Sequence, residues 1–180
     1  MDGAGKVTYT ETGKHANRGA KQLMKAIDNH AVTVNVTAEN TKVTSTGLRY
    51  NGGAFMGNTV GKAADGSNTV QTSQEINPQV LGAMDSYYNK SGKGTLHEVV
   101  ESYLGGDKSQ KTGIASGTGN DPQNYYQRSH NRAPSQPGPA IETFYDKAHN
   151  AVPEGSPAAV SVELSVQQGT RPAQVIQVTP

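Results

Sequence analysis

The chain of 180 residues contains no cysteine. This absence excludes disulfide bonds, thiol catalysis and zinc knuckles built on cysteine. The chain also has almost no surplus charge, because 16 Lys and Arg against 15 Asp and Glu leave a formal net charge of +1. Such a balance gives no field that would attract nucleic acid or an acidic membrane surface, so we expect neither as a partner.

Long apolar runs and nucleotide-binding loops are missing as well. With no run of about 18 apolar residues and no charged start followed by an apolar segment, we expect neither a membrane span nor a Sec signal. The chain has no G-x-G-x-x-G or Walker-type loop, so nucleotide binding loses its usual support. Only 33% of the residues are hydrophobic, which predicts one modest core with much exposed loop.

The first half of the chain shows helical and then strand periodicity. Residues 15–30 predict a surface helix with one apolar stripe, and the alternating segment 31–37 predicts a half-buried strand. Residues 42–50 and 68–73 predict further short strands. The glycine-rich segment 51–68 lies between them, and its Asn51-Gly52 and Asp65-Gly66 pairs are typical of hairpin turns.

Helix signals dominate the second half. Asn77-Pro78 predicts the start of one helix, and Gly105-Gly106 predicts the end of the next. Asp121-Pro122 predicts the start of a third, which carries Tyr126 and His130 one turn apart. A last short helix is predicted from a set of apolar residues that ends near His149; the set is Ile141, Phe144, Tyr145 and Ala148.

This order of elements predicts an α+β fold rather than alternating βαβ units. We expect an N-terminal helix, a small and mostly antiparallel sheet with a hairpin, and several helices after it. Residues 1–150 are predicted to form a single α+β domain. Residues 151–180 alternate only in AVSVELSV and QVIQV, which predicts a C-terminal hairpin or a partly ordered tail.

The segment TLHEVVESYLGG, residues 95–106, carries the candidate chemistry. On a helix its apolar residues form one stripe that faces the core; they are Leu96, Val99, Val100, Tyr103 and Leu104. His97 and Glu101 lie four residues apart on the flank of that stripe, so their side chains stack and can converge on one metal ion. Catalytic zinc uses three protein ligands of this kind and keeps an open position for water.

Glu98 has two competing interpretations. Next to the two candidate ligands, it could act as the general base for a water molecule activated by the metal. Thr95-x-x-Glu98 is also a capping box, in which the Glu98 carboxylate would bond the Thr95 N–H at the start of a helix. On the structural interpretation, HEVVE is merely the solvent-facing side of an amphipathic helix.

HEVVE resembles the His-Glu-x-x-His motif of zincin metallopeptidases, with Glu101 in place of the second histidine. The longer pattern LHEVVESYLGG, followed by YYQRSHNRAP, is similar to metallopeptidase-like toxin domains of bacterial Rhs-type and other polymorphic toxins. The resemblance covers roughly residues 70–134. It implies a zincin-like fold, a zinc-dependent hydrolase that cleaves a peptide or protein, and secretion or delivery of a toxin or effector into a target cell. It also implies neutralisation by an immunity protein.

By the same resemblance the third ligand is a histidine from later in the chain. His130 is the first choice because it lies beyond a glycine-containing loop on a predicted helix. His149 is the alternative downstream, while His15 and His30 precede the motif.

Other residues near His130 suggest supporting roles. Tyr126, or Tyr125 beside it, could donate a hydrogen bond to the oxyanion that forms when water attacks a carbonyl. Arg128 and Arg132 could bind a substrate carboxylate or support Glu101.

Two other functions remain open. In a metal-dependent nuclease, His130 and Asn131 would belong to a phosphodiesterase site, although the dispersed basic residues give little footprint for phosphates. In a nonenzymatic interaction module, the strands would offer an edge to a partner, and an edge near Ala54 to Met56 could equally hold a peptide by β-augmentation.

Overall fold

A computed structural model of the protein describes residues 5–10, 16–118 and 125–179. In that part of the chain it is α+β, with four helices and two small sheets. The chain divides into two compact units: unit 1 comprises 1–37, 54–75 and 96–134, and unit 2 comprises 38–53, 76–95 and 135–180. The predicted fold class is therefore confirmed at the level of α+β.

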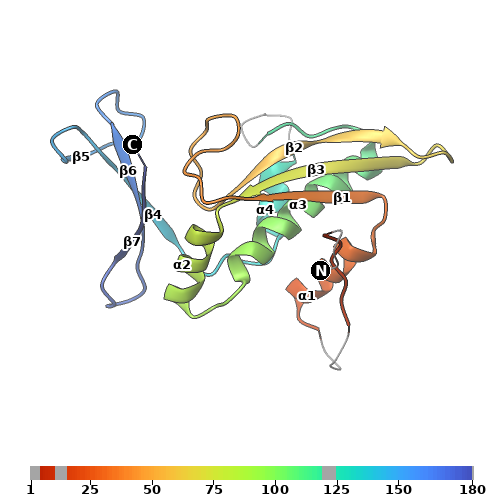
Figure 1. Ribbon diagram of the computed structural model, residues 1–180, viewed down its shortest axis with the longest axis horizontal. Helices are drawn as coiled ribbons and strands as arrows, with labels where there is room; N and C mark the ends of the chain where they lie inside the picture. The colour runs from red at the N-terminus through yellow and green to blue at the C-terminus, as the bar shows by residue number, and fades with distance from the viewer. Residues whose placement is uncertain (1–4, 11–15, 119–124, 180) are drawn as a thin grey trace. The chain divides into compact units, whose positions relative to one another are not determined.

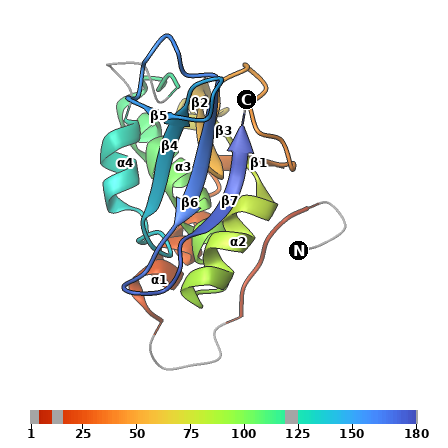
Figure 2. The ribbon, with the colours of Figure 1, turned by 90° about the vertical axis from the view of Figure 1, so that its left-hand side faces the viewer.

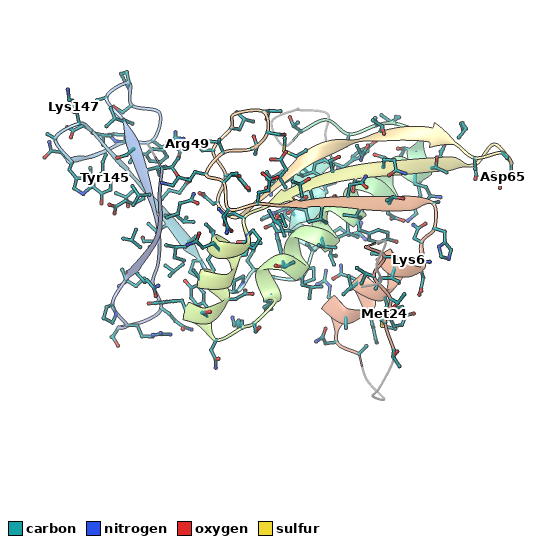
Figure 3. The ribbon with its side chains drawn as sticks, viewed as in Figure 1. Lys6, Met24, Arg49, Asp65, Tyr145 and Lys147 are labelled. Carbon is teal, nitrogen blue, oxygen red and sulfur yellow. The ribbon has the colours of Figure 1, made fainter. Side chains whose placement is uncertain are left out.

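The sheet of unit 1 has the strand order β1 (Val32–Ala38), β3 (Asn68–Ile76), β2 (Gly53–Lys62). β2 and β3 form the predicted hairpin, whose turn contains Asp65 and Gly66, and Asp65 accepts hydrogen bonds from the N–H and hydroxyl of Ser67. Figure 3 shows Asp65 at the tip of this hairpin. β1 and β3 run parallel in Figure 1, so the sheet mixes both directions.

Helix α3 (Lys93–Thr112) packs against one face of this sheet (Figure 1). The prediction that Gly105-Gly106 ends the helix was wrong, because both residues lie within it. Their lack of a side chain serves packing instead. A Cβ at Gly106 would lie 2.6 Å from side-chain carbons of both Thr72 and Val32, and one at Gly105 would lie 3.4 Å from the Phe55 ring.

Two further helices belong to unit 1. α1 (Arg18–Asp28) begins at Asn17, whose side chain accepts a hydrogen bond from the Ala20 N–H. This helix confirms the prediction for residues 15–30. α4 (Tyr126–Arg132) contains His130, as predicted, but the Asp121-Pro122 start lies outside the described residues.

Unit 2 contains α2 (Pro78–Tyr88), which begins at Asn77 and Pro78 as predicted. Figure 2 shows the second sheet, with the strand order β5 (Ala151–Val152), β4 (Ala140–Tyr145), β6 (Ser161–Val166), β7 (Gln174–Thr179). All three strand pairings in it are antiparallel. Its core is apolar; the buried members are Val80, Met84, Tyr87, Tyr88, Leu164 and Val166.

Two predictions in unit 2 were wrong. The expected helix over Ile141 to Ala148 is strand β4, followed by a turn. The segment is a strand because all six of its residues pair with β6, among them Phe144 with Val162 and Ile141 with Ser165. Ile141 and Phe144 are three residues apart and lie on opposite faces of the strand, so their spacing resembled that of a helix. Residues 42–50 contain only an isolated bridge between Val43 and Arg49 instead of a strand.

Candidate metal centre

The polar flank of α3 is buried. His97, Glu98 and Glu101 are exposed by only 3%, 5% and 2%, whereas the apolar residues Leu96, Val99 and Leu104 are only partly buried. The prediction that α3 buries one apolar side was therefore incomplete. HEVVE is therefore not a solvent-facing helix surface. Charged side chains buried to this degree are almost always paired.

Three of the predicted site residues converge in unit 1. The Glu101 Oε2 atom lies 3.2 Å from His97 Nε2 and 2.6 Å from His130 Nδ1. The two ring nitrogens lie 3.2 Å apart. His97 and Glu101 meet because they are one helical turn apart, and His130 is supplied by α4. The spacing in the sequence therefore explains why His97 and Glu101 are neighbours, whereas the tertiary fold places His130 beside them.

The three donor atoms lie close enough together to hold a single cation. Zinc ligands at about 2.0–2.1 Å in a tetrahedron are separated from one another by about 3.3–3.4 Å. The distances of 3.2 Å from His97 Nε2 are close to this value, and the 2.6 Å contact of His130 is a hydrogen bond to the carboxylate. The second oxygen of Glu101 is buried with no hydrogen-bond partner among the described residues. A cation would give this carboxylate additional stabilisation.

The tautomer of His97 is set by the backbone. The ring Nδ1–H donates a hydrogen bond to the carbonyl of Pro134, at 2.5 Å. The neutral ring therefore presents the lone pair of Nε2 to Glu101 and His130, which is the form that binds a metal. Sequence reasoning did not identify Pro134, because a backbone carbonyl leaves no trace in the residue type.

The C-terminal end of α4 is held by α1. The Arg132 carbonyl accepts hydrogen bonds from Gln22 Nε2 at 2.8 Å and from Arg18 Nη2 at 3.1 Å. A Cβ at Gly19 would lie 3.3 Å from Pro134. The first helix of the chain thus fixes the segment that carries His130 and the Pro134 carbonyl.

Opposing effects shift the pKa values of the ligands. Burial raises the pKa of Glu101, but the hydrogen bonds to His130 and His97, together with the charges of both histidines, outweigh burial and the pKa is lowered. Burial lowers the pKa of His97, but the hydrogen bonds to Glu101 and Pro134, together with the charges of Glu98 and Glu101, outweigh burial and the pKa is raised. The cluster thus favours an ionised carboxylate, which is the form of Glu101 that a metal requires.

Glu98 lies beside the cluster without belonging to it. Its Oε2 accepts a hydrogen bond of 2.8 Å from Gln74 on β3. The capping-box interpretation is not supported, because α3 begins at Lys93 and Thr95 lies inside it. Burial, and then the charge of Glu101, raise the pKa of Glu98 to about 7. A carboxyl group with this pKa can both accept and release a proton near neutral pH.

Tyr126 lies against the ring of His130. Its ring centroid lies 5.6 Å from that of His130. Burial, and then the charges of Glu101 and Glu98, raise its pKa to about 12, so the hydroxyl keeps its proton and can donate a hydrogen bond. Tyr125 lies elsewhere, with its hydroxyl 3.3 Å from that of Thr112.

The remaining predicted residues are not members of the cluster of His97, Glu101 and His130. Arg128, Arg132 and Asn131 are exposed, and Asn131 accepts a hydrogen bond from Gln127. His30 is exposed in the turn after α1, and His149 belongs to unit 2, where its ring stacks on Tyr145. Figure 3 labels Tyr145 in that unit. His15 lies outside the described residues.

No protein-family model, curated protein or solved structure matches this chain. Within residues 5–10, 16–118 and 125–179, no helix has the length and apolar character that crossing a membrane requires.

Proposed function

We propose that this chain is a zinc-dependent hydrolase of the metallopeptidase type, in which His97, Glu101 and His130 hold the metal. The observation that carries the proposal is the convergence of two imidazole nitrogens and one carboxylate oxygen, all within 4.8 Å of one another. Two histidines and one glutamate form a ligand set of catalytic zinc sites, and three protein ligands leave a position for water. Without cysteine in the chain, nitrogen and oxygen are the available donors.

Zinc bound there would polarise a substrate carbonyl and lower the pKa of water. Glu98 is the proposed general base, because its carboxyl lies beside the ligands and its pKa of about 7 suits proton transfer at neutral pH. Tyr126 is the proposed donor to the oxyanion, because its hydroxyl stays protonated. Each of these residues acts on a proton or a hydrogen bond that peptide hydrolysis requires.

The substrate class and setting follow from the resemblance. LHEVVESYLGG contains His97 and Glu101, and YYQRSHNRAP contains His130 and the Pro134 carbonyl that orients His97. The two segments on which the resemblance rests thus supply the same cluster. We therefore propose a zincin-like fold, a peptide or protein substrate, and a toxin or effector delivered into a target cell and neutralised by an immunity protein.

Metal analysis and one substitution test the proposal. Purified protein supplied with zinc should bind about one equivalent, and it should cleave members of a fluorogenic peptide mixture. Glu98→Gln should keep the zinc and lower turnover by about 10²- to 10⁴-fold, because it removes general base catalysis. Protein that binds no zinc when zinc is supplied contradicts the proposal. Cleavage of plasmid DNA or total RNA in parallel incubations, with no peptide cleaved, would favour the nuclease instead.

A further inference from the structure

Gln74 lies on the inner face of β3, between the sheet and α3. Its side chain is 0% exposed, and Val70 and Thr72 on the same face are exposed by 1% and 0%. The Gln74 Nε2–H donates a hydrogen bond to Glu98 Oε2 at 2.8 Å. Its side-chain carbonyl is buried with no hydrogen-bond partner among the described residues.

This arrangement is not one that stability alone favours. Leaving a buried acceptor unpaired costs about 1–3 kcal/mol. Thr72, two residues earlier on the same face, shows the satisfied alternative, because its hydroxyl lies 2.8 Å from that of Ser102 on α3. A methionine at position 74 would fill a similar volume without the unpaired oxygen. The glutamine is therefore better explained by its contact with Glu98.

A glutamine amide is well suited to hold the carboxylate of a general base in one orientation. It is a directional donor that carries no charge, so it fixes a carboxylate oxygen without neutralising the carboxylate. A lysine or arginine at this position would form an ion pair with Glu98 and hold it ionised. Neither hydrogen bond nor charge connects Gln74 to the three metal ligands in the described contacts, so its influence passes through Glu98.

We propose that Gln74 is a positioning residue, whose buried amide holds the Glu98 carboxylate beside the metal ligands. The inference rests on the proposed function, since it gives Glu98 the role of the base. It assigns a strand residue of the sheet to the reaction, and it predicts that position 74 affects turnover more than stability.

The experiment compares Gln74→Met and Gln74→Asn with a control, Thr72→Val, which breaks the neighbouring hydrogen bond to Ser102. Four quantities are measured: kcat and KM for the best-cleaved fluorogenic peptide, the zinc affinity, and the unfolding free energy of the zinc-free protein. Both Gln74 variants should lower kcat by about 10- to 100-fold, as loss of a supporting partner does, with KM and zinc affinity unchanged. Gln74→Met should keep or raise the stability, whereas Thr72→Val should lose stability and keep kcat.

Gln74→Asn guards against misfolding, because it keeps an amide but shortens its reach by one methylene group. A wild-type kcat in both Gln74 variants overturns the role of Gln74 and leaves the hydrolase intact. A loss of zinc affinity in parallel with stability also overturns it, because Gln74 would then support the fold rather than the base. Wild-type protein that cleaves no peptide overturns the proposed function and this inference together.

Discussion

The two units differ in what their helices bury against their sheets. In unit 2, α2 buries valine, methionine and two tyrosines in a cluster with Leu164 and Val166. In unit 1, the buried layer contains polar pairs, Thr72 with Ser102 and Gln74 with Glu98, beside the smaller apolar cluster of Val32, Val70 and Tyr103. Apolar burial stabilises without a required partner, whereas each buried polar group needs a hydrogen bond or an ion. The comparison indicates that apolar burial is the larger contribution to the stability of unit 2, whereas unit 1 buries several polar side chains in contact with one another.

The largest expected effect on stability is that of a substitution in the apolar core of unit 2. Leu164 is 2% exposed, so Leu164→Ala should lower the unfolding free energy by about 2–5 kcal/mol through lost burial and a cavity. Chemical denaturation measures this loss, and Val178→Ala is the control because Val178 is 44% exposed on the same sheet. The zinc affinity of the Leu164 variant should be unchanged. Equal losses in both variants would contradict an apolar core on one face of the sheet.

In unit 1 the largest expected effect of a substitution is on zinc affinity. His130→Ala removes one of three proposed ligands and should weaken zinc binding by more than about 100-fold, beyond the usual cost of losing a supporting partner. Competition with a chromogenic chelator measures this affinity. His30→Ala, an exposed histidine in the same unit, should bind zinc as the wild type does. If both variants bind zinc equally, His130 is no ligand.

Stability should depend on pH through Glu98. In the zinc-free protein its pKa is raised from 4.5 to about 7, so between these values the folded state binds more protons than the unfolded state. The stability contributed by protonated Glu98 is fully present below pH 4.5 and is lost as the pH rises through about 7. At 1.36 kcal/mol per pKa unit, this loss is on the order of 3 kcal/mol. His97, whose pKa is also raised, contributes in the same direction.

Denaturation curves of the wild type and Glu98→Gln, collected between pH 4.5 and 8, isolate the contribution of Glu98. The wild type should lose more stability over this range than the variant does. Parallel pH dependence in the two proteins would contradict the raised pKa, because it would show that Glu98 has the same pKa in the folded and unfolded states.

The smallest effect concerns two glycines, one in each unit. Gly106→Ala should cost about 1–3 kcal/mol, because its Cβ would meet Thr72 and Val32 at 2.6 Å and force α3 away from the sheet. Gly82→Ala in α2 meets nothing within 4 Å and should stabilise by about 0.5–1 kcal/mol, since alanine loses less backbone entropy in a helix. Thermal unfolding distinguishes the two signs. A neutral Gly106→Ala would mean that α3 and the sheet separate easily.

Local signals predicted the elements with strong starts and regular periods. Asn77-Pro78 marked α2, and the Asp65-Gly66 turn marked the β2–β3 hairpin. The signals failed where packing overrode them. Gly105-Gly106 suggested a helix end, yet the close approach of α3 to the sheet requires residues without side chains there. Ile141, Phe144 and Tyr145 fit a helix by spacing, but pairing with β6 made their segment a strand.

One missed residue left a signal in the sequence. Gln74 continues the alternation of Val70 and Thr72, but the predicted strand, 68–73, ended one residue before it, whereas β3 runs to Ile76. A large polar side chain on the buried face of a strand requires a buried partner. That requirement points to a polar residue on the helix opposite, although it cannot name Glu98.

The sequence by itself determined that His97 and Glu101 stack, because the helical repeat fixes neighbours four residues apart regardless of context. Only the tertiary structure decided that this flank is buried, that His130 joins it from α4, and that Gln74 and the Pro134 carbonyl hold its members in place. The physical reason is desolvation. A buried carboxylate needs hydrogen-bond donors or an opposite charge in place of water. For Glu101 and Glu98 such partners come from α4 and β3, and the periodicity of α3 alone does not predict which residues of other elements pack against it.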